Sequence, residues 1–161
     1  MSPITRALPI IPPNGLIRYL WYLLLLMPLA AAAEQPLNDD KPFATAHIIL
    51  QLSDADTSKQ AAVLDVANNL IKHYGGPEQV DIEIIAFGPG IILYEEKNPL
   101  VPRIRSLMSN EVRFVVCKNT LDTLERVKGR VPTLIDGLIY VQTGVVEIID
   151  RVNQGYVLVR P

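Results

Sequence analysis

Cys117 is the only cysteine in this chain of 161 residues, and its surroundings predict a reactive position. It follows the apolar run 112–116 and precedes Lys118-Asn119-Thr120, which favours the start of a helix. Open α/β sheets bind ligands at the carboxyl ends of their strands, and helix N-terminal amides with a nearby lysine stabilise a thiolate. Cys117 is therefore the candidate catalytic residue, and we expect its sulfur at the end of the strand to be partly open. The alternative is a small buried apolar side chain, the usual role of a free cysteine.

A second set of candidates follows the apolar run 80–87. Gly88-Pro89-Gly90 ends this run, and its backbone is expected to line the same crevice as Cys117. A plain turn is the alternative for this segment. The pattern is not a dinucleotide fingerprint, because a third glycine and a long helix after it are missing. The candidate ligand-binding residues are therefore Gly88, Gly90, Lys118, Asn119 and Thr120.

The other reactive residue types do not form a recognisable catalytic or metal-binding motif. The two histidines, His47 and His73, have no second histidine or cysteine at ligand spacing, so we expect no metal site and no cofactor. Asp54 and Asp56 follow the first predicted strand, where capping of the next helix is favoured over ligand binding. The chain lacks G-x-S-x-G, which argues against a hydrolase of that kind.

The elements that position these residues alternate between strand and helix. Apolar runs predict strands at 46–52, 80–87, 111–117, 138–142 and 156–160. Apolar spacing predicts helices at 57–74, 99–109, 120–127 and 143–153, a short helix at 91–96, and a loop or short helix over 128–139. In the helix 143–153, Val145, Ile148, Ile149 and Val152 are expected on one face. The alternation predicts an α/β fold, a three-layer α/β/α sandwich with a mainly parallel five-stranded sheet.

The first 33 residues have the order of a secretory signal peptide. Arg6 and Arg18 precede the apolar run 19–27, and the alanine-rich run 29–33 resembles a cleavage site. We expect cleavage and a periplasmic protein; the alternative is an uncleaved anchor, which would be its only contact with a membrane. Residues 34–43 are polar and contain proline, which predicts a flexible arm before a domain over 44–161.

Charge and surface patterning limit the partners. The formal net charge is −2, and no basic patch interleaved with aromatic residues is present, which excludes nucleic acid as a partner. The four apolar residues of 91–94 follow Gly90 directly. Exposed together, they would make a patch that predicts a homo-oligomer, whereas packing against the sheet is the alternative.

Several segments, in order, resemble the DsrE/DsrF-like family. They are residues 51–54, 68–70, 86–91 and 114–121, then 144–148, 154–156 and the terminal Arg160-Pro161. The resemblance covers nearly all of 46–161. It implies a doubly wound, parallel five-stranded sheet and assembly into dimers, trimers or hexamers. It also implies a persulfide carried at the position matching Cys117, as in the sulfur-relay members, which include YchN-like and TusD-like proteins.

Two features differ from the well-studied relay members, which are cytoplasmic. This chain has the expected export leader, and Lys118-Asn119-Thr120 replaces the arginine–glycine pair that commonly follows the cysteine in TusD-like relatives. Three hypotheses follow. The protein is an exported sulfurtransferase or persulfide carrier that binds or relays sulfane sulfur through Cys117, with a donor or acceptor protein as partner. Alternatively, it is a non-catalytic oligomeric module that binds a small ligand or a partner, or a redox sensor in which Cys117 pairs between subunits.

Overall fold

The computed structural model describes Asn38 and residues 40–161. The expected signal peptide and its cleavage site lie outside the described residues. Within the described part, no helix combines the length and the apolar character needed to cross a bilayer.

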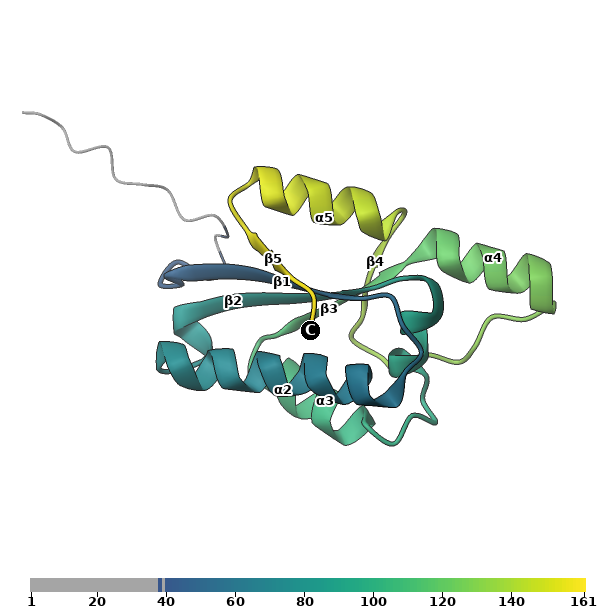
Figure 1. The fold of residues 1–161 in the computed structure, drawn as a ribbon, viewed down its shortest axis with the longest axis horizontal. Coiled ribbons are helices and arrows are strands. Elements are labelled where there is room, and N and C mark those ends of the chain that lie inside the picture. Colours follow the sequence, from purple (N-terminus) through teal and green to yellow (C-terminus); the bar gives the residue numbers. More distant parts are fainter. Residues whose placement is uncertain (1–37, 39) are drawn as a thin grey trace, which may run out of the picture. The chain divides into compact units, whose positions relative to one another are not determined.

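Five parallel strands form one sheet in the order β4-β3-β2-β1-β5. Among the described residues, α2 and α3 cover one face of the sheet, α5 covers the other, and α4 extends beyond the sheet (Figure 1). This architecture confirms the predicted α/β sandwich. The strands are β1 (Ala46–Leu52), β2 (Val80–Ala86), β3 (Arg113–Cys117), β4 (Ile139–Val141) and β5 (Val157–Val159); the α-helices are α2 (Thr57–Tyr74), α3 (Val101–Ser109), α4 (Lys118–Lys128) and α5 (Gly144–Asn153).

The first helix after β1 is capped as expected. The Asp56 carboxylate accepts hydrogen bonds from the backbone amides of Ser58 and Lys59, so it satisfies donors that the first turn of α2 leaves unpaired. Asp54 instead pairs with Lys59 at 2.7 Å and with Arg160 at 3.6 Å. Both aspartates therefore have structural partners at this end of the sheet.

Side chains alternate between the two faces of the central strands. Every residue of β2 is buried, as is typical of an inner strand in a parallel sheet. Even-numbered residues such as Ile82 and Ile84 join a large apolar cluster beneath α2 and α3. Odd-numbered residues face α5, where the apolar cluster is small: Ile49, Ile85, Val115, Ile148 and Tyr156. The main core therefore lies on the side of α2 and α3.

The segment after β2 corrects one prediction. A 3-10 helix, η2 (Gly88–Tyr94), packs three of the four apolar residues that were expected on the surface. Ile91, Leu93 and Tyr94 are buried, and only Ile92 is exposed, at 39%. The Tyr94 hydroxyl donates to the Ile84 carbonyl at 2.8 Å, which holds η2 against β2. The expected apolar patch at 91–94 is therefore wrong, and its alternative, packing against the sheet, is right.

An exposed apolar surface lies instead near the C-terminus. Of the four apolar residues expected on one face of α5, only Ile148 is buried, and Val145, Ile149 and Val152 point outward. All three residues of the edge strand β5 are also exposed. We call these residues together with Val146 the C-terminal apolar surface: Val145, Val146, Ile149, Val152, Val157, Leu158 and Val159.

Element boundaries moved where turns intervene. β3 begins at Arg113 and not at 111, because Glu111 has a φ of 61° and the Val112 amide still bonds to the Leu107 carbonyl of α3. A short 3-10 helix, η1 (Pro77–Gln79), precedes β2. The stretch 129–138 is mostly irregular, and Leu134 forms a single antiparallel bridge with Glu95. In the predicted arm, the ammonium of buried Lys41 donates to the Pro77 carbonyl at 2.7 Å.

Candidate functional site

Cys117 stands where the sequence placed it, at the carboxyl end of β3 and directly before the first residue of α4. Its side chain is only 5% exposed, however, so the expectation of a partly open thiol is wrong. The thiol is on the α5 side of the sheet, because it shares the odd-numbered face with Val115. The residues that cover it come from the start of α5.

Gly144, the first residue of α5, lies against Cys117. A β-carbon added at Gly144 would lie 3.3 Å from the Cys117 β-carbon and 3.4 Å from both Ile85 and Phe87. A side chain here would press against Cys117 and its neighbours, so glycine favours the close start of the helix. The Cys117 thiol donates a weak hydrogen bond to the Gln142 carbonyl at 3.7 Å. Both the helix start and the segment before it therefore contact the cysteine.

Asn119 connects the start of α4 to the start of α5. Its backbone amide donates to the Gln142 carbonyl at 3.1 Å, and its side-chain amide donates to the Thr143 hydroxyl at 2.9 Å. The Gln142 side-chain amide in turn donates to the Asn119 side-chain oxygen at 2.6 Å. Asn119 was predicted as a ligand-binding residue, and its polar atoms hold the segment over Cys117.

The other predicted residues separate into two groups. The Gly88 amide donates to the Thr120 hydroxyl at 2.9 Å, which joins the end of β2 to α4. At Gly90 an added β-carbon would lie 2.3 Å from the Leu52 carbonyl oxygen, so this glycine serves the packing of η2 on β1. Lys118 is exposed. The predicted crevice therefore contains Gly88, Asn119 and Thr120, but not Gly90 or Lys118.

These three residues line a groove between η2 and α4. The groove has a volume of about 500 Å³ and a mainly apolar wall that includes Ile91, Ile92 and Leu124. A second hollow of about 420 Å³ shares Glu95, Leu124 and Lys128 with the groove. Cys117 does not line either hollow. The structure therefore separates the thiol from the groove, although the sequence predicted one crevice.

A buried ionic cluster between β2 and α5 was not predicted. Asp81 and Glu83 are fully buried on the α5 side of β2. Arg113 binds both carboxylates, at 2.5 Å and 3.0 Å, and Arg151 Nε lies 3.2 Å from Glu83. The Tyr156 hydroxyl donates to Asp81 at 2.5 Å. Two acidic residues two positions apart in an inner strand were the signal in the sequence that could have revealed this cluster.

Burial and pairing act in opposite directions on the two carboxyl groups. Burial opposes ionisation of Asp81, but hydrogen bonds from Arg113 and Tyr156 outweigh it and hold the Asp81 pKa below its ordinary value. Burial dominates at Glu83 and raises its pKa, despite the nearby arginines. Burial and the bond to Asp81 raise the pKa of Tyr156 to about 12. One oxygen of Glu83 has no hydrogen-bond partner, so Glu83 is the less satisfied carboxyl group.

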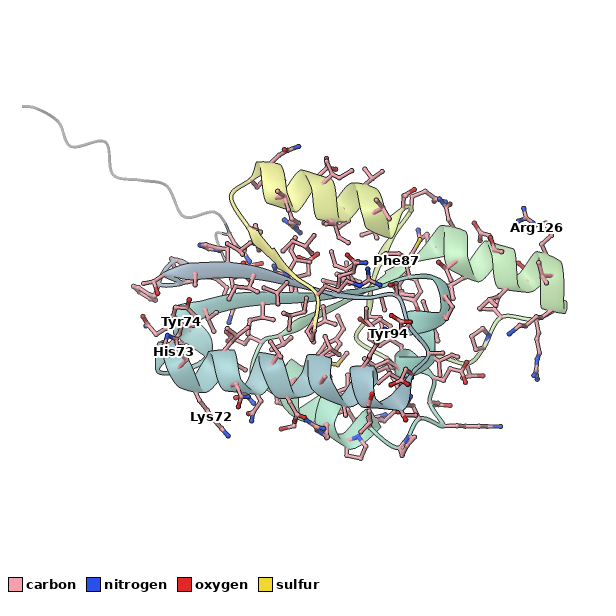
Figure 2. All side chains as sticks on the ribbon, in the orientation of Figure 1. Lys72, His73, Tyr74, Phe87, Tyr94 and Arg126 are labelled. Carbon is pink, nitrogen blue, oxygen red and sulfur yellow. The ribbon has the colours of Figure 1, made fainter. Side chains whose placement is uncertain are left out.

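The histidines lie in structural surroundings. His47 Nδ1 lies 3.5 Å from Asp81, and the His47 ring packs edge-on against Tyr156. Figure 2 shows His73 beside Tyr74 at the C-terminal end of α2, distant from Phe87 at the other end of the sheet. Among the described residues, no group of three or more histidine, cysteine or acidic side chains is arranged to hold a metal ion.

Comparison with known proteins finds similarity at the level of structure. No family model matches the chain, and no curated protein matches it. A solved structure, the protein of unknown function MTH1491 from Methanobacterium thermoautotrophicum, is 25% identical and superposes with a TM-score of 0.64. The match covers 72% of this chain and 99% of that chain. This similarity supports the α/β fold, and it assigns no activity, because the function of MTH1491 is itself unknown.

Proposed function

We propose that the protein is an exported carrier of sulfane sulfur that uses Cys117. The observation that carries this proposal is the position of the sole cysteine at the carboxyl end of β3, directly before α4. The exposed Lys118 and the amides of the first turn of α4 favour negative charge there. The resemblance to the DsrE/DsrF-like family supports the same role.

The proposed step is a transfer of one sulfur atom. The Cys117 thiolate attacks the terminal sulfur of a donor persulfide, the sulfur–sulfur bond of the donor breaks, and the donor leaves as a thiolate. Cys117 then carries the persulfide until an acceptor thiolate repeats the attack. Exposed persulfides and thiols are oxidised readily outside the cytoplasm, and the low exposure of Cys117 would protect it between transfers.

Intact-mass analysis tests this proposal. The purified domain is mixed with inorganic polysulfide, freed of excess reagent and weighed, with Cys117→Ser as the matched control. We expect a gain of one sulfur atom in the wild type and no gain in the variant. Absence of the gain after native and mildly denaturing treatment alike would contradict the proposal. A covalent dimer that reductant converts to monomers would instead support the redox-sensor hypothesis.

A second candidate function is the binding of a small ligand in the groove between η2 and α4. Its volume of about 500 Å³ lies within the usual range for ligand sites, and its wall is mainly apolar with the charged groups Glu95 and Lys128. We expect the amphipathic dye 1-anilinonaphthalene-8-sulfonate to bind there. Leu124→Asp should abolish the fluorescence gain, and Val145→Asp should leave it. The reverse pattern would place the dye on α5 and remove support for the groove.

We also propose that a second copy of the chain covers the C-terminal apolar surface. α5 is apolar on its inner and outer faces, which is typical of a helix buried on both sides. The neighbouring edge strand β5 also exposes apolar side chains, and an uncovered apolar edge favours pairing with another chain.

Light scattering tests this association. We expect an oligomer at micromolar concentration, Ile149→Asp to give monomers, and Val127→Asp to leave the oligomer intact. Val127 is the control because it is 72% exposed and lies on α4, outside the C-terminal apolar surface. A wild-type monomer at that concentration would rule out the proposed interface.

A further inference from the structure

The buried state of Cys117 conflicts with any transfer to or from another molecule. A donor must bring its sulfur into line with the thiol, and 5% exposure does not allow this approach. The cover includes the start of α5 at Gly144 and the preceding Gln142, whose carbonyl accepts the weak hydrogen bond from the thiol. A local movement of this segment would therefore expose the thiol without disturbing the main core beneath α2 and α3.

Asn119 makes polar side-chain contacts to the end of α5 nearest Cys117, just after β4, whose Val141 pairs with Cys117 in the sheet. The Asn119 side chain makes one hydrogen bond to Thr143 and one to Gln142, and its backbone amide makes a third. Thr143, which precedes α5, makes no side-chain bond to the amides of its first turn. Asn119 and Gln142 are exposed, so water competes for these bonds.

The far end of α5 is held more firmly. Arg151 lies 3.2 Å from buried Glu83 and 3.1 Å from Glu147, and its guanidinium group stacks over the Tyr156 ring at 5.6 Å. The Tyr156 amide also donates to the Arg151 carbonyl at 3.0 Å. Ile148, in the middle of α5, packs into the small apolar cluster. The two ends of the helix are thus attached by bonds of different kinds.

We propose that α5 and the segment before it form a gate over Cys117. Asn119 is the latch, and the contacts of Arg151 with Glu83 and Tyr156 are the fixed end. The gate opens when the bonds of Asn119 to Gln142 and Thr143 break and the first turn of α5 moves off the thiol. The purpose of the gate rests on the proposed sulfur chemistry, but the movement itself does not.

Alkylation of folded protein by iodoacetamide tests the gate, since this reagent reports access to the thiol and needs no sulfur donor. Asn119→Ala removes the two side-chain bonds, so we expect the alkylation rate to rise about tenfold. Asn110→Ala is the matched control, because it removes the same side chain at the end of α3, where the Asn110 amide donates to the Ser106 carbonyl at 2.8 Å. An unchanged rate in Asn119→Ala would overturn the proposal.

Two further measurements separate local opening from global unfolding. Low concentrations of urea should leave the alkylation rate of Asn119→Ala nearly constant, because local opening exposes little surface. In the wild type, the Glu147 amide, bonded to the Thr143 carbonyl, should exchange with solvent faster than the Gln154 amide at the fixed end. A steep urea dependence, or faster exchange at Gln154, would contradict the gate. A variant that fails to take up sulfur but is alkylated faster would leave the gate intact and refute the carrier.

Discussion

The two faces of the sheet are built in different ways. The face beneath α2 and α3 buries a continuous apolar cluster that includes Ile84, Phe114 and Leu64. The face beneath α5 buries only a small apolar cluster, and beside it lie the fully buried carboxyl groups of Asp81 and Glu83. The proposed site at Cys117 lies on this second face.

The difference teaches which face can move. A helix that packs over a large apolar area cannot move away from the sheet without exposing many apolar side chains to water. α5 buries only Gly144 and Ile148, which amounts to about 2 kcal/mol for one large aliphatic side chain. Its remaining attachment is through ion pairs and hydrogen bonds, which break one at a time. A site that must open is therefore expected on the face of the sheet that α5 covers.

The largest expected effects are on the apolar face. Ile84→Ala should lower the free energy of unfolding by up to about 5 kcal/mol, because the close-packed surroundings of Ile84 cannot collapse into the cavity. Ile148→Ala should cost about 2 kcal/mol, because α5 can shift to fill the space. Urea denaturation of both variants measures the two values. Equal losses would remove the contrast between the faces.

The next effect concerns the ionic cluster. Arg113→Met leaves Asp81 and Glu83 buried with fewer cationic partners, so we expect a loss of about 3 kcal/mol. Arg103→Met is the control, since Arg103 pairs with the exposed Asp65 and its removal should cost less than about 1 kcal/mol. Thermal and urea denaturation check both values. Similar losses in the two variants would show that Arg113 is no more important for stability than a surface arginine.

The smallest effect is a pH dependence of opposite sign at the two carboxyl groups. The pKa of Asp81 is lowered in the folded protein. Asp81 therefore stabilises the fold above pH 3.8, its ordinary pKa, and this stabilisation is lost as the pH falls through the pKa of the folded state. The pKa of Glu83 is raised in the folded protein. Glu83 therefore stabilises the fold below pH 4.5, its ordinary pKa, and this stabilisation is lost as the pH rises through the pKa of the folded state.

Urea denaturation across this range measures the two contributions. In Asp81→Asn, the free energy of unfolding should fall less steeply as the pH is lowered. In Glu83→Gln, it should fall less steeply as the pH is raised above 4.5. A change on the same side in both variants would mean that the two groups titrate as one. The direction assigned to Glu83 would then be wrong.

Much of the fold could be predicted because periodicity is local. The first strand and the helix 57–74 were predicted with the observed boundaries, since their apolar spacing and the Asp56 cap lie within the segments themselves. Short edge strands were less accurate: β5 covers three residues where five were expected. Edge residues pair on one side only, so the pattern of one strand does not determine where pairing stops.

The candidate site was predicted in part. The position of Cys117 at the end of β3 could be predicted, because the strand pattern ends and the helix pattern begins there. Its burial could not, since the cover comes from Gly144, a residue distant in sequence whose closeness depends on the crossing of α5. Asn119 was expected to bind a ligand, and its partners Gln142 and Thr143 are similarly remote. The burial of Asp81 and Glu83 could not be predicted, since their partners Arg113 and Arg151 are also remote in sequence.

The sequence by itself determined the order of strands and helices, the sole thiol and its place at the carboxyl end of β3, because these depend on neighbours along the chain. Only the tertiary structure decided which apolar runs are covered: 91–94 is mostly buried, whereas the outer face of α5 is exposed. It also decided that two acidic side chains are buried and that the thiol is closed. Burial depends on what packs from elsewhere in the chain, and no local pattern carries that information.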